Sequence, residues 1–131
     1  MLEELLRGTG ASRVTLRQGD GFPVTHEALA PGVPSIRDEQ TVDLRIQPVA
    51  LEVAAGRQVV QNDSRAAHDD PAFQQMLEAY GGLAAQIVTP VFQDGGVAAI
   101  LSLHQVGRPR RWTEGEIDAC GEAAGRVADR L

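Results

Sequence analysis

The stretch that decides the fold runs from residue 86 to residue 106 and reads Gln86-Ile87-Val88-Thr89-Pro90-Val91-Phe92, Gln93-Asp94-Gly95-Gly96, Val97-Ala98-Ala99-Ile100-Leu101-Ser102-Leu103-His104-Gln105-Val106. An Asp-Gly step between two apolar, β-prone runs predicts a hairpin, because glycine adopts the positive φ that tight primed turns need. The early part of the second run is apolar on both faces, which predicts a central strand in a sheet that is covered on each side.

The second strand divides its side chains between two faces. The two-residue period of a strand places Ile100, Ser102 and His104 on one face and Leu101 and Leu103 on the other. Buried polar side chains such as Ser102 and His104 must be hydrogen-bonded or contact a ligand. We therefore expect them to face a loop-covered side, with His104 lining any cavity there. The uniformly apolar face suits packing under helices.

Periodicity and turn residues predict the other elements. The expected strands are Ser12–Gln18, Phe22–Ala30 and Gln58–Gln61, and the expected helices are a short N-terminal helix carrying Leu2, Leu5 and Leu6, then Gln47–Ala55, Pro71–Tyr80, and a last helix that starts at a capping box of Thr113 and Glu116. This mixed order predicts an α+β fold, a sandwich around one antiparallel sheet.

Two of these segments carry further expectations. In Ser12–Gln18, Arg13, Thr15 and Arg17 alternate with Val14 and Leu16, which predicts a strand with one wet face. Residues 31–45 show no period and contain Pro31, Gly32 and Pro34. A loop of this length in a compact domain often covers a binding site.

Size and charge bound the class of protein. A chain of 131 residues is expected to form one domain over residues 1–131. A net charge of −6 argues against nucleic acid as the partner, because phosphate binding needs a basic face. No apolar run approaches membrane-spanning length, and the N-terminus lacks the pattern of a signal peptide. A cytoplasmic location without membrane contact is the resulting expectation.

No group of residues predicts catalysis or metal binding. Asp63, His68, Asp69 and Asp70 are metal-ligand types, but Asp70 is explained as a helix cap and the others follow no strict ligand pattern. The side chains of Ser102 and His104 share a face and point parallel to each other, and no nucleophile motif surrounds the serine. We expect a protein that is not an enzyme and has no metal site.

The same residues carry a family resemblance. The run Ile87–Val91, the glycine-containing turn, the strand Ala99–His104 and the exit Trp112–Ile117 together resemble a GAF domain. The segment from His104 through Pro109-Arg110-Arg111-Trp112 looks most like the bilin-binding GAF domains of phytochromes and cyanobacteriochromes. The resemblance implies terminal helices on one face of the sheet, and loops and short helices on the other.

The resemblance also bears on ligands. Bilin-binding relatives carry a Cys-His pair on the helix before the hairpin, and Phe73 and Gln74 hold that place here, which argues against a covalently bound bilin. His104 matches the later histidine that lies against the chromophore in those domains. The resemblance to free-methionine-(R)-sulfoxide reductases fails because those enzymes use several cysteines, whereas Cys120 is alone and is interpreted as a packed hydrophobe. The expected ligand-binding residues are His104, Ser102, Ile100, Thr89 and Phe73.

Two functions from different classes follow. The first is a sensory domain that binds an unidentified small molecule and signals through its terminal helices. The alternative is a ligand-free GAF domain that acts as a dimerisation or interaction module, with its pocket filled by its own side chains, and a small enzyme is the weakest reading. A heptad-like seam on the last helix predicts a homodimer; it consists of Ile117, Cys120, Ala124, Val127 and Leu131.

Overall fold

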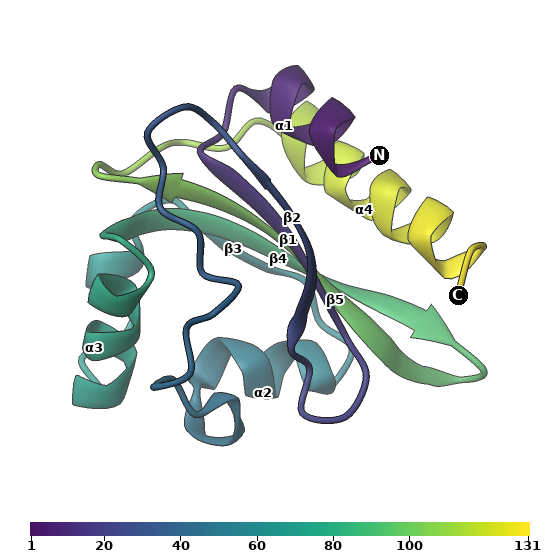
Figure 1. Cartoon of the computed structure of the whole chain (residues 1–131), viewed down its shortest axis with the longest axis horizontal. Coiled ribbons are helices and arrows are strands. Elements are labelled where there is room, and N and C mark those ends of the chain that lie inside the picture. The colour runs from purple at the N-terminus through teal and green to yellow at the C-terminus, as the bar shows by residue number, and fades with distance from the viewer.

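The computed structural model describes all residues from 1 to 131 and consists of a five-stranded sheet with helices on both faces (Figure 1). The strands are β1 (Arg13–Gln18), β2 (Val24–Leu29), β3 (Val59–Gln61), β4 (Leu83–Gln93) and β5 (Gly96–Val106). The α-helices are α1 (Leu2–Thr9), α2 (Pro48–Ala54), α3 (Pro71–Ala79) and α4 (Glu114–Ala128), and two short 3-10 helices are η1 (Leu44–Ile46) and η2 (Ser64–Ala66). None of the helices combines the length and apolar composition needed to cross a membrane.

The sheet is antiparallel throughout, in the order β2-β1-β5-β4-β3. The predicted α+β fold is therefore confirmed, with β5 at the centre as its two apolar faces indicate. The main difference from the prediction is that β4 begins at Leu83 rather than at Gln86. The added residues are mostly alanine, a weak strand former, and they become a strand because β5 is long enough to pair with them, as Leu83 does with Val106.

The hairpin between β4 and β5 closes on the predicted turn. Gln93 pairs with Gly96, and the two residues between them have positive φ angles of 54° at Asp94 and 82° at Gly95. Positive φ at both central residues is the mark of the primed turn whose twist matches that of the two strands.

Both terminal helices lie on the same face of the sheet, as predicted (Figure 1). The core on this face combines Leu5 and Leu6 of α1 with Leu101 and Leu103 of β5 and with residues of α4. The expected capping box starts α4: the Thr113 hydroxyl accepts from the Glu116 N–H, and the Glu116 carboxylate accepts from the Thr113 N–H.

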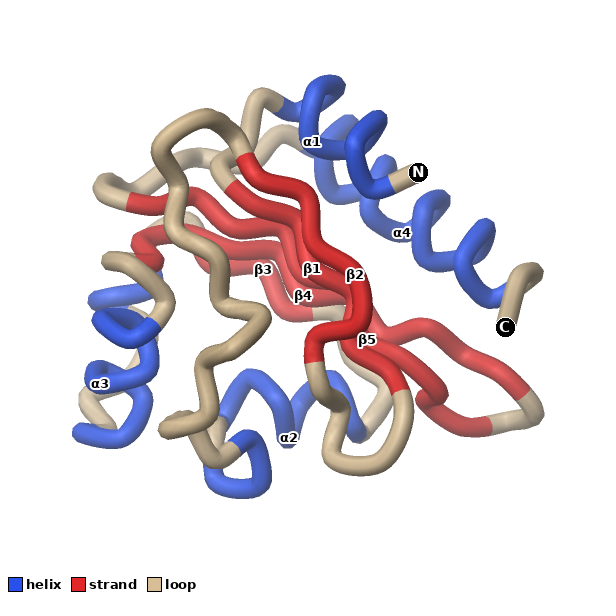
Figure 2. Tube along the Cα trace, viewed as in Figure 1, coloured by secondary structure: helices blue, strands red, loops and turns tan.

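The second face is covered by α2, α3 and the long segment between β2 and α2, which crosses in front of the sheet in Figure 2. Helix α3 starts where the sequence predicts, since the Asp70 carboxylate accepts hydrogen bonds from the N–H groups of Ala72 and Phe73. A second apolar core lies here, between the helices and the sheet; its buried members include Ile36, Val53, Phe73, Leu77 and Leu83.

The middle of the seam on the last helix is buried within the chain, whereas Leu131 at its end is 42% exposed. Cys120, Ala124 and Val127 are at most 5% exposed, because the sheet covers them together with α1. Most of the seam is therefore covered within one chain, by the sheet as well as by α1, and it offers little apolar surface to a second chain. Homodimer formation stays a prediction, but the seam no longer supports it.

Candidate ligand-binding site

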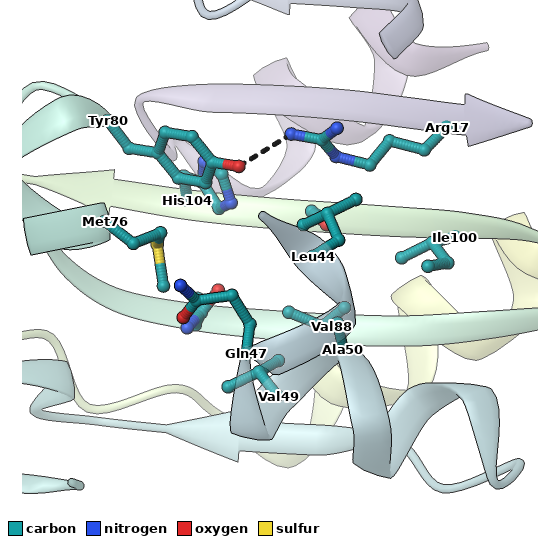
Figure 3. A pocket seen from close by; sticks show the side chains of 12 residues that line it. Arg17, Leu44, Gln47, Val49, Ala50, Met76, Tyr80, Val88, Ile100 and His104 are labelled. Atoms are coloured by element: carbon teal, nitrogen blue, oxygen red, sulfur yellow. Dashed lines mark hydrogen bonds between the residues drawn. The ribbon is translucent and has the colours of Figure 1, made fainter. Parts of the chain in front are cut away.

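A small cavity lies between the second face of the sheet and the elements that cover it (Figure 3). Its volume is about 50 Å³. The residues that line it come from β1, η1, α2, α3, β4 and β5 and are Arg17, Leu44, Gln47, Val49, Ala50, Met76, Tyr80, Gln86, Val88, Ile100, Ser102 and His104. The walls are mostly apolar with a few polar groups, the usual make-up of small-molecule sites, although ordinary ligand pockets are larger, at roughly 300–1,000 Å³.

Strand β5 supplies three of the lining residues, and they are the three that alternation predicts. Ile100, Ser102 and His104 line the cavity, while Leu101 and Leu103 belong to the core under the terminal helices. The placement follows from the two-residue period alone. Ligand contact by these three residues stays a prediction.

Two other residues expected at the site lie elsewhere. Thr89 is on the opposite face of the sheet from Val88 and accepts a hydrogen bond from the Gln58 amide at 3.0 Å, beside α4. Phe73 is fully buried in the second core, edge-on to the His68 ring at 4.9 Å, and does not line the cavity. Their predicted placement at the site is wrong. Gln86 and Val88 line the cavity in place of Thr89, because side chains alternate along β4 and those of the even-numbered residues point toward the cavity.

Arg13, at the start of β1, is fully buried beside the cavity. Its guanidinium donates three hydrogen bonds: Nε to Nδ1 of His104 at 3.1 Å, Nη1 to the Pro34 carbonyl at 2.9 Å and Nη2 to the Tyr80 carbonyl at 2.6 Å. Burial lowers the pKa of Arg13 to about 10, so the side chain is still charged at neutral pH. One cation thus ties β5, the long loop and the end of α3 to β1.

The burial of Arg13 contradicts the prediction that one face of β1 is exposed to solvent. Arg13 and Thr15 have no exposed surface, and Arg17 is half-buried. The alternation places these residues on one face as predicted, but the long loop and α3 cover that face. Thr15 lies opposite Ser102 in the sheet, and its hydroxyl oxygen is buried with no hydrogen-bond partner in the chain.

His104 is neutral in this environment. Burial, and then the positive charges of Arg13 and Arg17, hold its pKa well below the usual value. Because Nδ1 accepts the hydrogen bond from Arg13, the ring proton must be on Nε2. The cavity therefore meets a fixed N–H donor rather than an imidazolium or a general base.

Tyr80 and Arg17 form the polar edge of the cavity. The Tyr80 ring stacks against the His104 ring with centroids 6.0 Å apart, and its hydroxyl accepts a hydrogen bond from Nη2 of Arg17 at 2.8 Å (Figure 3). Burial raises the pKa of Tyr80, and the nearby Arg17 opposes that shift. The phenol is thus protonated at neutral pH, and its O–H is a second donor.

Two buried glutamines were not expected at the site. Gln86, 3% exposed, lies opposite His104 on β4, and its amide nitrogen donates to Oε1 of Gln61 at 3.0 Å. Gln47, also 3% exposed, donates from its amide nitrogen to the Ala72 carbonyl at 3.3 Å, while its own Oε1 has no donor. Pairing β4 with β5 in the sequence, so that Gln86 lies opposite His104, could have predicted that Gln86 faces the cavity.

The residues that line the cavity carry positive charge only. Arg17 is the only ionised residue among the twelve that line the cavity, and none of them is acidic. The chain also holds no cluster of three or more His, Cys, Asp or Glu side chains arranged as metal ligands. Burial raises the pKa of the Cys120 thiol to about 12, which fits a packed hydrophobe on the other face of the sheet. The site offers hydrogen-bond donors and acceptors on an apolar surface.

Comparison with known proteins identifies the family. The GAF domain model matches residues 1–131, and this chain therefore belongs to the GAF domain family. No curated protein is significantly similar to it in sequence.

Solved structures agree with this assignment of the fold. The GAF3 domain of Slr1393 from Synechocystis sp. PCC6803, in its photoproduct state, is 20% identical with a TM-score of 0.79, over 97% of this chain and 85% of that one. The cyanobacteriochrome TePixJ GAF domain is 25% identical with a TM-score of 0.79, over 98% and 84%. A domain of a putative two-component sensor histidine kinase protein from Sinorhizobium meliloti 1021 is 12% identical with a TM-score of 0.75, over 98% and 84%.

Proposed function

We propose that this chain is a cytoplasmic sensory domain that binds a small molecule in the cavity beside His104 and has no enzymatic activity of its own. The observation that carries the proposal is the fixed donor at Nε2 of His104, a residue that lines an apolar cavity, because this nitrogen makes no hydrogen bond within the chain. A ligand acceptor in the cavity would therefore gain a hydrogen bond, which contributes about 0.5–1.5 kcal/mol net.

The size of the cavity limits the ligand. A volume of about 50 Å³ holds roughly four water-sized spheres, since one water needs about 10–15 Å³ of such space. A tetrapyrrole would require α2 and the long loop to move away. The neighbours that are cyanobacteriochromes support a sensory role by family, and the replacement of the Cys-His pair by Phe73 and Gln74 argues against a covalent bilin here.

Signalling would pass through β5 to the terminal helices. On this strand Ser102 and His104 face the cavity, whereas the neighbouring Leu101 and Leu103 pack beneath α1 and α4. A ligand that shifts β5 would change the packing of both helices, because close-packed interfaces respond to small displacements. Association of two chains through these helices is part of the proposal.

Native mass spectrometry tests the binding step. The purified chain, incubated with the small-molecule fraction of a cell extract, should retain a low-mass adduct. The control is Ala50→Phe, a change at a half-buried position on α2 that adds a ring at the cavity wall and should abolish the adduct. Failure to retain an adduct from any extract, or equal retention by the variant, would contradict the proposal.

The small volume favours a second candidate, a GAF domain whose pocket is filled by its own side chains and which acts through protein contacts alone. Leu44, Met76 and Tyr80 occupy the space between the sheet and its cover. Under this reading, Ala50→Phe would change neither small-molecule retention nor the partner-dependent activity of the full protein.

A further inference from the structure

Gln86 and His104 form a pair at the floor of the cavity. They are directly opposite each other on β4 and β5, and both line the cavity. Side chains in this relationship have Cβ atoms about 4.5–5.5 Å apart, close enough for both to contact one small molecule.

Each member of the pair is held in place from behind. The Gln86 amide nitrogen donates to Gln61, so its oxygen is the free end of the amide. His104 accepts from Arg13 at Nδ1, so Nε2–H is the free end of the ring. Oε1 of Gln86 and Nε2 of His104 make no hydrogen bond within the chain, and neither is among its fully enclosed unsatisfied atoms, so both keep accessible surface. The pair therefore presents one acceptor and one donor whose orientations are fixed by buried neighbours.

We propose that this pair recognises the O=C–N–H edge of a small uncharged amide. The ligand carbonyl accepts from Nε2–H of His104, and the ligand N–H donates to Oε1 of Gln86. The inference rests on the proposed function, because it names the ligand class of the same cavity. The volume of about 50 Å³ fits an amide group with few further heavy atoms.

Other ligand classes match the pair less well. An anion such as a carboxylate is attracted by Arg17, but it has no hydrogen to donate to Oε1 of Gln86. A ketone satisfies His104 and leaves Gln86 without a donor. An amine cation is repelled by Arg17 and by the buried Arg13.

Three probes of equal size separate these classes. Acetamide, acetone and acetate each have four heavy atoms, and they differ only in whether they carry a donor or a charge. Dissociation constants are measured from the methyl resonances of Val88 and Ile100, which line the cavity. We expect acetamide to bind at least tenfold more tightly than acetone or acetate, the effect of about one buried hydrogen bond.

Variants assign that preference to Gln86. Gln86→Met should reduce the affinity for acetamide to that for acetone and leave acetone binding unchanged. Gln75→Leu, a similar change at an exposed position on α3, should keep the wild-type ranking. If Gln86→Met does not fold, the wild-type ranking decides alone. Tightest binding of acetate, or equal binding of all three probes, would overturn the amide preference while leaving a ligand-binding cavity. No binding of any probe would overturn both proposals.

Discussion

Nε of Arg13 donates a hydrogen bond to Nδ1 of His104 at 3.1 Å, between two buried side chains that lie opposite each other on adjacent strands. Arg13 has no exposed surface, and His104 is 3% exposed. The contact sets the tautomer of His104, and therefore what the cavity offers to a ligand.

Arg13→Met should lower the free energy of unfolding by about 2–5 kcal/mol, because it leaves the Pro34 and Tyr80 carbonyls and Nδ1 of His104 without their donor. Chemical denaturation measures the loss. Arg108→Met, at an exposed position, is the matched control and should stay within about 0.5 kcal/mol of wild type. Equal stability of the two variants would show that the three hydrogen bonds contribute little.

The neutral state of His104 predicts a specific pH dependence. Its folded-state pKa lies well below 6.5, so the unfolded chain takes up the proton first as the pH falls. The contribution to stability is complete above pH 6.5 and is lost as the pH falls toward the folded-state pKa, by at most about 1.4 kcal/mol per pH unit. His104→Asn can still accept from Arg13 but cannot titrate, and it should lose less stability between pH 7 and pH 5. Parallel losses would argue against a neutral buried histidine.

Two adjacent glycines at the end of α3 allow the cost of backbone strain to be measured apart from the cost of a steric clash. Gly81 and Gly82 have φ angles of +79° and +85°, but a Cβ on Gly81 would lie 2.7 Å from Cγ of Pro34, whereas one on Gly82 would meet open space. Gly82→Ala should cost about 1–2 kcal/mol, from backbone strain. Gly81→Ala should cost about 1–3 kcal/mol more, because it also displaces the loop that covers Arg13. Equal costs would mean that this loop yields freely.

Homodimer formation should use the exposed face of α4. Gly121 and Gly125 lie on this face and have open space around them, so a second helix could approach closely. Sedimentation at micromolar concentration should give twice the mass of one chain. The double change Gly121→Glu and Gly125→Glu should restore a monomer without loss of helix stability, since each change removes a helix-interior glycine. A wild-type chain that is monomeric at these concentrations would contradict the dimer.

Local sequence rules predicted most of the fold. Alternation assigned the two faces of β5, the Asp94-Gly95 step set the hairpin, and the caps of α3 and α4 lie where Asp70 and Thr113 indicate. These features depend on residues that are near each other in the chain, so the sequence contains the information directly.

The candidate site was less predictable because it depends on which strands are neighbours. The alternation of Arg13 and Thr15 with apolar residues is the same for a wet face and for a face that a distant loop covers. Which side chains of β4 face the cavity depends on how β4 pairs with β5, and this register cannot be read from local sequence. In the structure Gln86 pairs with His104 and lines the cavity, whereas Thr89 does not. The buried Arg13–His104 contact joins residues 91 positions apart, and no local pattern specifies it.

Methyl NMR shows whether small molecules enter the cavity beside His104. Addition of the small-molecule fraction of a cell extract should shift the resonances of Val88 and Ile100, which line the cavity. Those of Val14 and Val91, on the opposite face of the sheet, should change less. Ala50→Phe should suppress the shifts of Val88 and Ile100. Unchanged Val88 and Ile100 resonances in the wild type, or shifts of the same size in the variant, would contradict a ligand-binding cavity.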